Sequence, residues 1–208
     1  MIILIDNGHG NNTLGKASPI LDFEIPNQFV SNKRFREALY NRVIARELVT
    51  KLKEYGYDAR LVVPEDTDVS LSERVRRINT ICNREGASNV ILISIHSNAA
   101  GNGTSFSNAN GWEAYTTRGK TKSDTLATYL YNRAKINFPN RKIRTDWTDG
   151  DIDKEADFYI IKKSKCPAVL TENFFYDNKD DLEYLTSDEG IHAVVRTHLE
   201  GIIDYIKG

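Results

Sequence analysis

The residues best suited to chemistry in this chain stand at the ends of its most apolar segments. His9 lies directly after the first apolar run, between two glycines that we expect to allow a tight turn with unusual backbone angles. His96 follows the apolar run 89–95, and Glu172 follows the run 167–171. Short apolar runs bounded by Gly, Asn or Pro predict buried strands, and the carboxyl ends of parallel strands meet at one edge of a sheet. We therefore expect these side chains to converge.

Two imidazoles and nearby carboxylates form a typical hydrolytic zinc site, because both groups bind Zn²⁺ at about 2.0–2.2 Å and leave a position for water. The site needs a further ligand, for which Glu37 is the best candidate and Glu24, in the preceding loop, is a competitor. The alternative for Glu37 is a helix first-turn residue that interacts with the helix dipole. The alternative for His9 is a turn residue that caps a strand.

The pattern of the chain predicts an α/β fold in one domain, residues 1–208. Strands that alternate with helices indicate a three-layer structure, with a mainly parallel, mixed sheet of about six strands and helices on both faces. Strands are expected at residues 2–5, 58–63, 89–95, 111–116, 158–161 and 168–171. Helices are expected at 35–55, 71–85, 123–138, 180–185 and 188–206, whereas 11–34 and 139–157 read as irregular segments.

Composition excludes several classes of protein. The formal net charge is -1, with 28 basic and 29 acidic residues, so no global field favours nucleic acid or an anionic membrane. No run is long enough to span a bilayer. The start of the chain lacks the pattern of a signal peptide, so we expect synthesis in the cytoplasm with phage-type release, or removal of a signal.

The two cysteines, Cys82 and Cys166, lack the spacing of a metal-binding motif. Cys82 is predicted to be a buried free thiol, and a disulfide between the two cysteines is the alternative.

Taken together, the segments resemble the zinc-dependent N-acetylmuramoyl-L-alanine amidases, the catalytic domain type of bacterial cell-division amidases and phage endolysins. The similarity follows the family's order over nearly the whole chain. The matching segments are Ile5-Asp-Asn-Gly-His-Gly10, Glu37-Ala-Leu-Tyr-Asn41, Tyr55-Gly-Tyr57, Ser70-Leu-Ser-Glu-Arg74 with Asn79, Ser94-Ile-His-Ser-Asn98, and Pro167-Ala-Val-Leu-Thr-Glu172 with Phe175 and Asn178.

This resemblance implies one Zn²⁺ held by His9, Glu37 and His96, with Glu172 as the catalytic acid and base. It favours Glu37 over Glu24, because the family's ligand glutamate opens a helix with an asparagine four residues later. It also implies a hydrolase that cleaves the amide bond between N-acetylmuramic acid and L-alanine. The substrate would be peptidoglycan of the cell wall or periplasm. We expect the protein to act as a monomer and, from its balanced charge and the lack of a membrane-spanning run, without nucleic acid or membrane insertion.

Three features depart from the family pattern. Asn7 stands where proline is common, and Asn173-Phe174 stands where a small residue and glycine are usual. The loop between His9 and Glu37 is also longer than expected. No departure removes a ligand, so we expect the last two to reshape the substrate cleft rather than the chemistry.

Two other functions fit the same residues: a zinc peptidase of carboxypeptidase type, and a catalytically silent cell-wall binding domain. The retained Glu172 argues against the silent domain. Asn98 and Arg144 are candidate substrate contacts with structural roles as the alternative, and Trp112 and Trp147 either line a sugar cleft or pack. The two remaining histidines, His192 and His198, are expected to pack or face solvent.

Overall fold

The computed structural model describes all residues, 1–208, and places a six-stranded sheet at the centre of the chain. In spatial order the strands are β4 (Asp58–Leu61), β1 (Ile2–Asn7), β5 (Val90–Asn98), β8 (Ala168–Phe175), β6 (Glu113–Thr116) and β7 (Lys154–Glu155). β1 pairs in parallel with β4 on one side and β5 on the other, and β5 pairs in parallel with β8. β6 runs antiparallel to β8, so the sheet is mixed but mainly parallel, as predicted.

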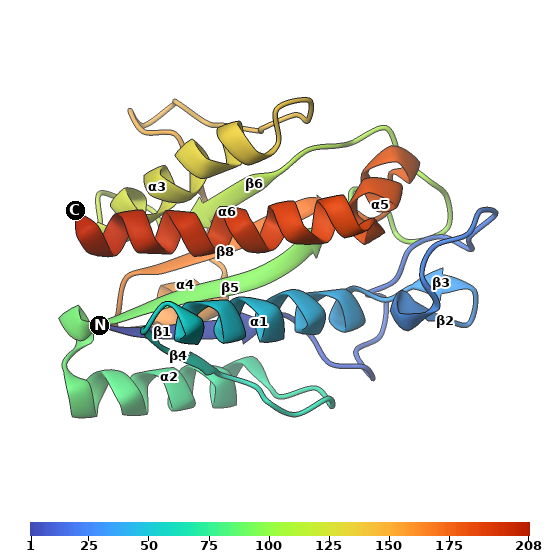
Figure 1. Cartoon of the computed structure of the whole chain (residues 1–208). Helices are drawn as coiled ribbons and strands as arrows, with labels where there is room; N and C mark the ends of the chain where they lie inside the picture. The colour runs from blue at the N-terminus through green and yellow to red at the C-terminus, as the bar shows by residue number, and fades with distance from the viewer.

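Helices cover both faces of this sheet (Figure 1). One face carries α1 (Glu37–Glu54), α3 (Lys122–Asn137) and α6 (Asp188–Lys207), and the opposite face carries α2 (Leu71–Glu85) and α4 (Tyr159–Lys163). α5 (Lys179–Thr186) joins β8 to α6. Short 3-10 turns at Asn27–Phe29 and Ala87–Asn89 precede β2 (Val30–Ser31) and β5, respectively. None of the helices has both the length and the apolarity needed to cross a bilayer.

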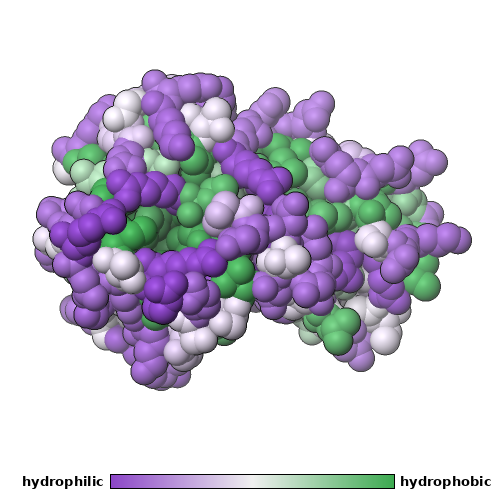
Figure 2. Space-filling view, turned by 90° about the horizontal axis from the view of Figure 1, so that it is seen from below, coloured by the Kyte–Doolittle hydropathy of each residue, from purple (hydrophilic) through white to green (hydrophobic).

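The central strands are apolar on both faces because both faces are covered. Alternate residues of β1 divide between the two cores: Ile3 and Ile5 pack against α1, α3 and α6, whereas Leu4 packs against α2 and α4. Toward the carboxyl ends of the strands, the face of the sheet that α2 covers becomes polar. On that face Leu4 is followed by Asp6 in β1, Leu92 by Ser94 and His96 in β5, and Leu170 by Glu172 in β8. The polar end of this face is where a site can form. Viewed from below, the surface is mostly hydrophilic, with apolar residues in separate patches (Figure 2).

One predicted strand is wrong. Residues 158–161 begin helix α4, and the sixth strand of the sheet is β7, which lies in the segment 139–157 that the sequence leaves irregular. A short apolar run does not distinguish strand from helix. Here the adjacent residues Ile160 and Ile161 are both buried in the α2 core, as in a helical turn rather than in a strand with alternating faces.

The long segment after β1 is partly structured. It contains a two-stranded hairpin, β2 (Val30–Ser31) and β3 (Arg34–Phe35). Phe29 and Phe35 are fully buried and pack against Tyr40 of α1, with ring centroids 5.6 and 5.9 Å from the tyrosine ring. The hairpin therefore anchors the end of this segment directly before α1.

Several predicted packing residues lie as expected. Cys82 and Cys166 are buried free thiols in the same apolar cluster. His198 is fully buried and contacts the hydroxyl of Thr171 through Nε2 at 2.9 Å, whereas His192 is exposed. These two histidines have no part in the polar edge of the sheet.

Phe174 explains one departure from the family pattern. Its φ is +62°, in the left-handed region that favours glycine, and its ring is fully buried. The ring packs edge to face against Phe138 and Tyr184, with centroids 5.0 and 5.3 Å apart. The chain therefore carries backbone strain at a position where glycine is unstrained, and aromatic packing offsets it.

We predict that Phe174→Gly destabilises the protein less than Phe174→Ala. Both variants lose the ring, which costs about 3–5 kcal/mol for a buried phenylalanine. Only glycine also relieves the left-handed backbone, by about 1 kcal/mol. Urea unfolding measures the two free energies.

The matched pair is Phe138→Ala and Phe138→Gly, because Phe138 belongs to the same aromatic cluster but has a φ of -121°. At position 138 the glycine variant is expected to have a free energy of unfolding no higher than that of the alanine variant. Equal free energies of unfolding for the two variants at position 174 would contradict the proposed backbone strain at Phe174.

Candidate metal centre

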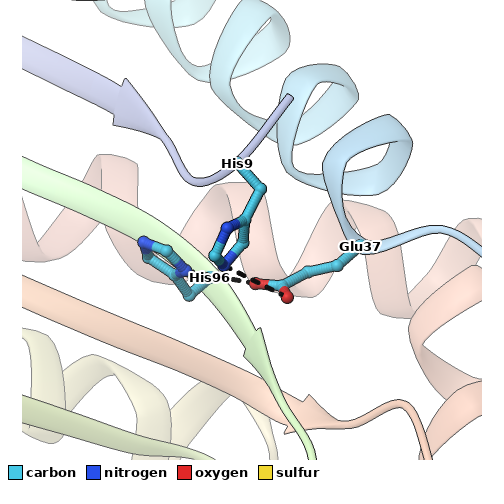
Figure 3. A group of neighbouring side chains, drawn as sticks. All are labelled: His9, Glu37 and His96. Atoms are coloured by element: carbon cyan, nitrogen blue, oxygen red, sulfur yellow. Dashed lines mark hydrogen bonds and ion pairs between the residues drawn. The ribbon is translucent and has the colours of Figure 1, made fainter. Parts of the chain in front are cut away.

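Three side chains from separate elements meet at the carboxyl edge of the sheet (Figure 3). His9 comes from the turn after β1, Glu37 from the first residue of α1, and His96 from β5. Glu37 Oε2 lies 3.5 Å from His9 Nε2, and Glu37 Oε1 lies 3.1 Å from His96 Nδ1. One ligand atom from each residue lies within 4.8 Å of the others. The structure thus brings the three sequence-predicted metal ligands together.

The carboxylate of Glu37 is buried and held in one orientation. Its Oε1 accepts hydrogen bonds from the Ser97 backbone N–H at 3.2 Å and from Asn41 Nδ2 at 3.3 Å. Asn41, one helical turn later on α1, also donates to the carbonyl of Gly8 at 3.3 Å. The asparagine therefore ties the carboxylate to the histidine turn, and Oε2 is left facing His9. Glu24 is exposed in the loop and lies outside this group.

The turn around His9 differs from the sequence prediction. We expected the flanking glycines to supply unusual backbone angles, but the positive φ, +66°, belongs to His9 itself. The glycines are needed for space. A Cβ at Gly8 would lie 2.1 Å from Cε1 of the His96 ring, and a Cβ at Gly10 would lie 2.1 Å from the backbone N of Asp68.

The donor set fits a zinc ion. Ligand atoms around a tetrahedral zinc with bonds of about 2.1 Å stand roughly 3.4 Å apart. The two histidine nitrogens lie 3.5 Å from Glu37 Oε2 and 3.1 Å from Glu37 Oε1, and one ligand atom from each residue lies within 4.8 Å of the others. The two imidazole rings lie edge to face, with centroids 4.9 Å apart, so they approach the carboxylate from different directions. Two nitrogens and one carboxylate oxygen also leave a fourth position for water or substrate.

Burial and charge set the protonation of these groups. Burial lowers the pKa of His9 to about 4, which favours the neutral imidazole that metals bind. Burial alone would raise the pKa of Glu37, but the hydrogen bond with His96 and the charges of both histidines bring it below its ordinary value. Burial by itself would lower the pKa of His96, but the hydrogen bond with Glu37 and the charge of that carboxylate have the larger combined effect and raise it above its ordinary value.

Glu172 lies beside the three ligands rather than among them. It pairs with His96 in the register of β5 and β8, so both side chains project from the α2 face. Its Oε2 is buried and has no hydrogen-bond partner. Burial raises the pKa of this carboxyl group to about 8. A buried carboxyl group without a partner at the edge of a metal site is a candidate proton carrier.

The sequence analysis missed Glu113, the neighbour of Glu172 across β6 and β8. This carboxylate is buried, with 1% of its surface exposed. It accepts hydrogen bonds from Arg144 Nε at 2.6 Å, Lys154 Nζ at 2.9 Å and Asn98 Nδ2 at 2.7 Å. Asn98 and Arg144, the two candidate substrate contacts, thus bind a buried carboxylate of the protein itself. The sequence signal that could have identified Glu113 was a lone acidic residue inside the short predicted strand 111–116.

A cavity of about 210 Å³ opens beside His9 and His96. Its remaining lining comes from Asp6, Gly8, Asp68, Val69, Ser70, Leu71 and Arg74. Neither tryptophan lines this cavity: Trp112 is buried in the core, and Trp147 is 62% exposed in the segment before β7.

We predict that Gly8→Ala disrupts the metal centre, because the new methyl group would overlap the His96 ring. Affinity for Zn²⁺, measured by competition with a chromophoric chelator, should fall at least about tenfold. Gly101→Ala is the control, since a Cβ there meets no atom closer than 3.3 Å. Unchanged zinc affinity in Gly8→Ala would contradict the steric requirement.

Comparisons with known proteins agree with this geometry. The family model of N-acetylmuramoyl-L-alanine amidase matches residues 3–204. The chain is 32% identical over 208 residues to N-acetylmuramoyl-L-alanine amidase LytC of Bacillus subtilis (strain 168), and 25% identical over 211 residues to the endolysin of Bacillus phage SPP1. Each alignment covers 99% of this chain, but only 35% of LytC and 66% of the endolysin.

A solved structure is similar over its whole length. N-acetylmuramoyl-L-alanine amidase AmiC2 of Nostoc punctiforme superposes with a TM-score of 0.76 at 25% identity, covering 100% of this chain and 98% of that one. The six-stranded sheet and its flanking helices are therefore the fold of this group.

Proposed function

The chain belongs to the N-acetylmuramoyl-L-alanine amidase family, and from this premise we propose that residues 1–208 act as one catalytic domain. It hydrolyses the amide bond between N-acetylmuramic acid and L-alanine of peptidoglycan. The observation that carries the proposal is the convergence of His9, Glu37 and His96 with the unpartnered carboxyl group of Glu172 at one edge of the sheet.

The resident metal in this proposal is one Zn²⁺, held by His9, Glu37 and His96. When bound, zinc lowers the pKa of water and polarises the scissile carbonyl group as a Lewis acid. The protein contributes the orientation of its ligands. Ser97 and Asn41 fix the Glu37 carboxylate, and Gly8 leaves room for the His96 ring.

Glu172 is proposed to carry the proton. Its carboxylate accepts a proton from the attacking water and then donates it to the nitrogen of the departing L-alanine. A carboxyl group with a raised pKa performs both transfers near neutral pH, because neither protonation state is strongly preferred. No other group of the protein competes for Oε2, which has no hydrogen-bond partner.

The neighbouring Glu113 keeps this edge of the sheet electrostatically balanced. Its negative charge faces two cations, Arg144 and Lys154, which hydrogen-bond to it and hold its pKa below the ordinary value despite burial. Without those cations, a second buried carboxylate next to Glu172 would further raise the energy of the ionised form of Glu172.

We propose peptidoglycan at the cell wall as the partner, and a monomer as the active form.

Product analysis tests the reaction. Digestion of purified peptidoglycan with the zinc-loaded protein is expected to free the amino group of L-alanine without new reducing sugar ends. Trimming of peptides from their carboxyl ends would instead establish a carboxypeptidase. No release with zinc bound would establish a silent binding domain.

Variants separate the metal ligands from the proton carrier. Glu172→Gln should keep stoichiometric zinc, measured by atomic absorption, and lose about 10²-fold or more in kcat, because general acid–base catalysis contributes about 10²–10⁴-fold. His9→Ala, His96→Ala and Glu37→Gln should lose zinc itself.

The matched controls are His192→Ala for the histidines and Glu24→Gln for Glu37, since both residues are exposed and lie outside the metal group. Both controls should keep zinc and turnover. Normal zinc content in any of the three ligand variants would overturn the ligand assignment.

A further inference from the structure

The backbone carbonyl of His9 has two charged donors. The guanidinium of Arg42 donates to it through Nη1 at 3.0 Å, and that of Arg74 through Nη2 at 3.2 Å. Arg42 lies on α1 and Arg74 on α2, the helices that cover opposite faces of the sheet. Both side chains are buried, with 3% and 2% of the residue surface exposed. The turn after β1 is therefore held from both sides.

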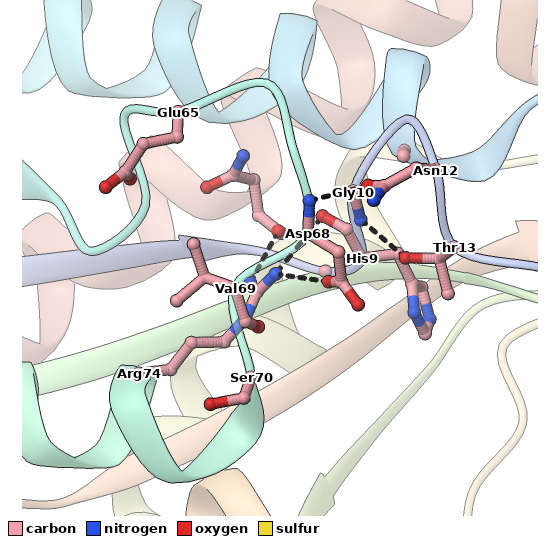
Figure 4. A network of polar contacts seen from close by, with 12 residues as sticks. His9, Gly10, Asn12, Thr13, Glu65, Asp68, Val69, Ser70 and Arg74 are labelled. Carbon is pink, nitrogen blue, oxygen red and sulfur yellow. Dashed lines mark hydrogen bonds and ion pairs between the residues drawn. The ribbon is translucent and has the colours of Figure 1, made fainter.

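Arg74 also satisfies the backbone around this turn (Figure 4). It donates to the Asn7 carbonyl at 2.9 Å and to the Val69 carbonyl at 2.8 Å. Two carboxylates balance its charge. The buried Asp6 accepts a hydrogen bond from Arg74 Nη1 at 2.7 Å, and Asp68 accepts one from Nη2 at 3.3 Å. These bonds tie the end of β1 to the loop before α2.

Arg42 is bound mainly by backbone carbonyls. It donates to Glu65 O through Nη2 at 3.0 Å and to Ala38 O at 3.1 Å. Its nearest carboxylate, Asp66, lies 3.8 Å away and is largely exposed. A buried guanidinium is costly unless its donors are used, so the position of Arg42 depends on the carbonyls that surround it, that of His9 included.

The conformation that these bonds hold is a strained one. A non-glycine residue at positive φ costs about 1–3 kcal/mol and persists where its surroundings determine it, and His9 has a φ of +66°. The loop before α2 closes over the same turn: the Asp66 carbonyl accepts from Asn11 N–H at 3.0 Å, and Asp68 N–H donates to Asn12 Oδ1 at 2.8 Å (Figure 4).

We propose that Arg42 and Arg74 are positioning residues for the metal centre: by clamping the His9 carbonyl from both faces of the sheet, they aim its imidazole at Glu37 and His96. The inference rests on the proposed zinc site. It assigns these buried arginines a role in metal affinity in addition to stability. Lysine cannot replace either one, because a single ammonium group lacks the planar fork that reaches several carbonyls together.

The experiment compares Arg42→Lys and Arg74→Lys with the wild type. Each variant should bind Zn²⁺ about 10–100-fold more weakly in chelator competition, the usual loss when a group that orients a metal ligand is removed. The visible absorption spectrum of the Co²⁺-substituted protein should also change, because it reports ligand geometry. Neither readout needs amidase activity, so failure of the proposed reaction would remain distinguishable from failure of the clamp.

The control is Arg133→Lys, since Arg133 bridges α3 and α6 through Asp204 and Glu200 away from the metal centre. It should keep wild-type zinc affinity and cobalt spectrum. Far-UV circular dichroism and urea unfolding identify variants that remain folded. Folded Arg42→Lys and Arg74→Lys proteins with wild-type affinity and spectrum would overturn the proposal, as would an equal affinity loss in Arg133→Lys.

Discussion

The parallel register of β1, β5 and β8 is the constraint on which the site depends. Pairing Asp6 with Ser94 and His96 with Glu172 aligns the polar ends of three apolar strands at one edge. A shift of one residue in either pairing would turn His96 or Glu172 to the opposite face, toward α1 and α6. The apolar halves of the same strands set that register, because their side chains alternate between two cores. The core thus determines the position of the chemistry.

The second constraint is the burial of charge at this edge. Acidic and basic groups lie there with little solvent, and each is bound by specific donors or acceptors: Glu37 by Asn41 and Ser97, and Asp6 by Arg74 and the Ser94 hydroxyl. Burial without such partners is costly. Glu172 Oε2 and Asn7 Oδ1 are buried at this end of the sheet without a hydrogen-bond partner. Of these two side chains only Glu172 can take up and release a proton, which is the role that we propose for it.

Two of the three departures from the family pattern have physical accounts in the structure. Phe174 takes the backbone angle of a glycine and offsets the strain by packing its ring against Phe138 and Tyr184. The long segment after His9 ends in a hairpin whose Phe29 and Phe35 are part of the core against α1. Neither feature displaces a residue of the metal centre.

The sequence by itself determined the fold class, most helices and strands, and the three metal-ligand candidates. Periodicity and local signals, such as the Ser70 side chain that caps α2, specify the elements and the two strand-end histidines, and the resemblance to the amidase family selects Glu37 over Glu24. Segment 158–161 was predicted wrongly as a strand, because a short apolar run has no period of its own. Only the tertiary structure decided how the site is held. The positive φ of His9, the space required at Gly8, the buried Glu113 and the two arginines on the His9 carbonyl all depend on contacts between residues distant in the chain. Apart from the lone acidic residue in a short apolar strand that marks Glu113, local sequence carries no signal for such contacts, because they exist only after the two faces of the sheet are covered.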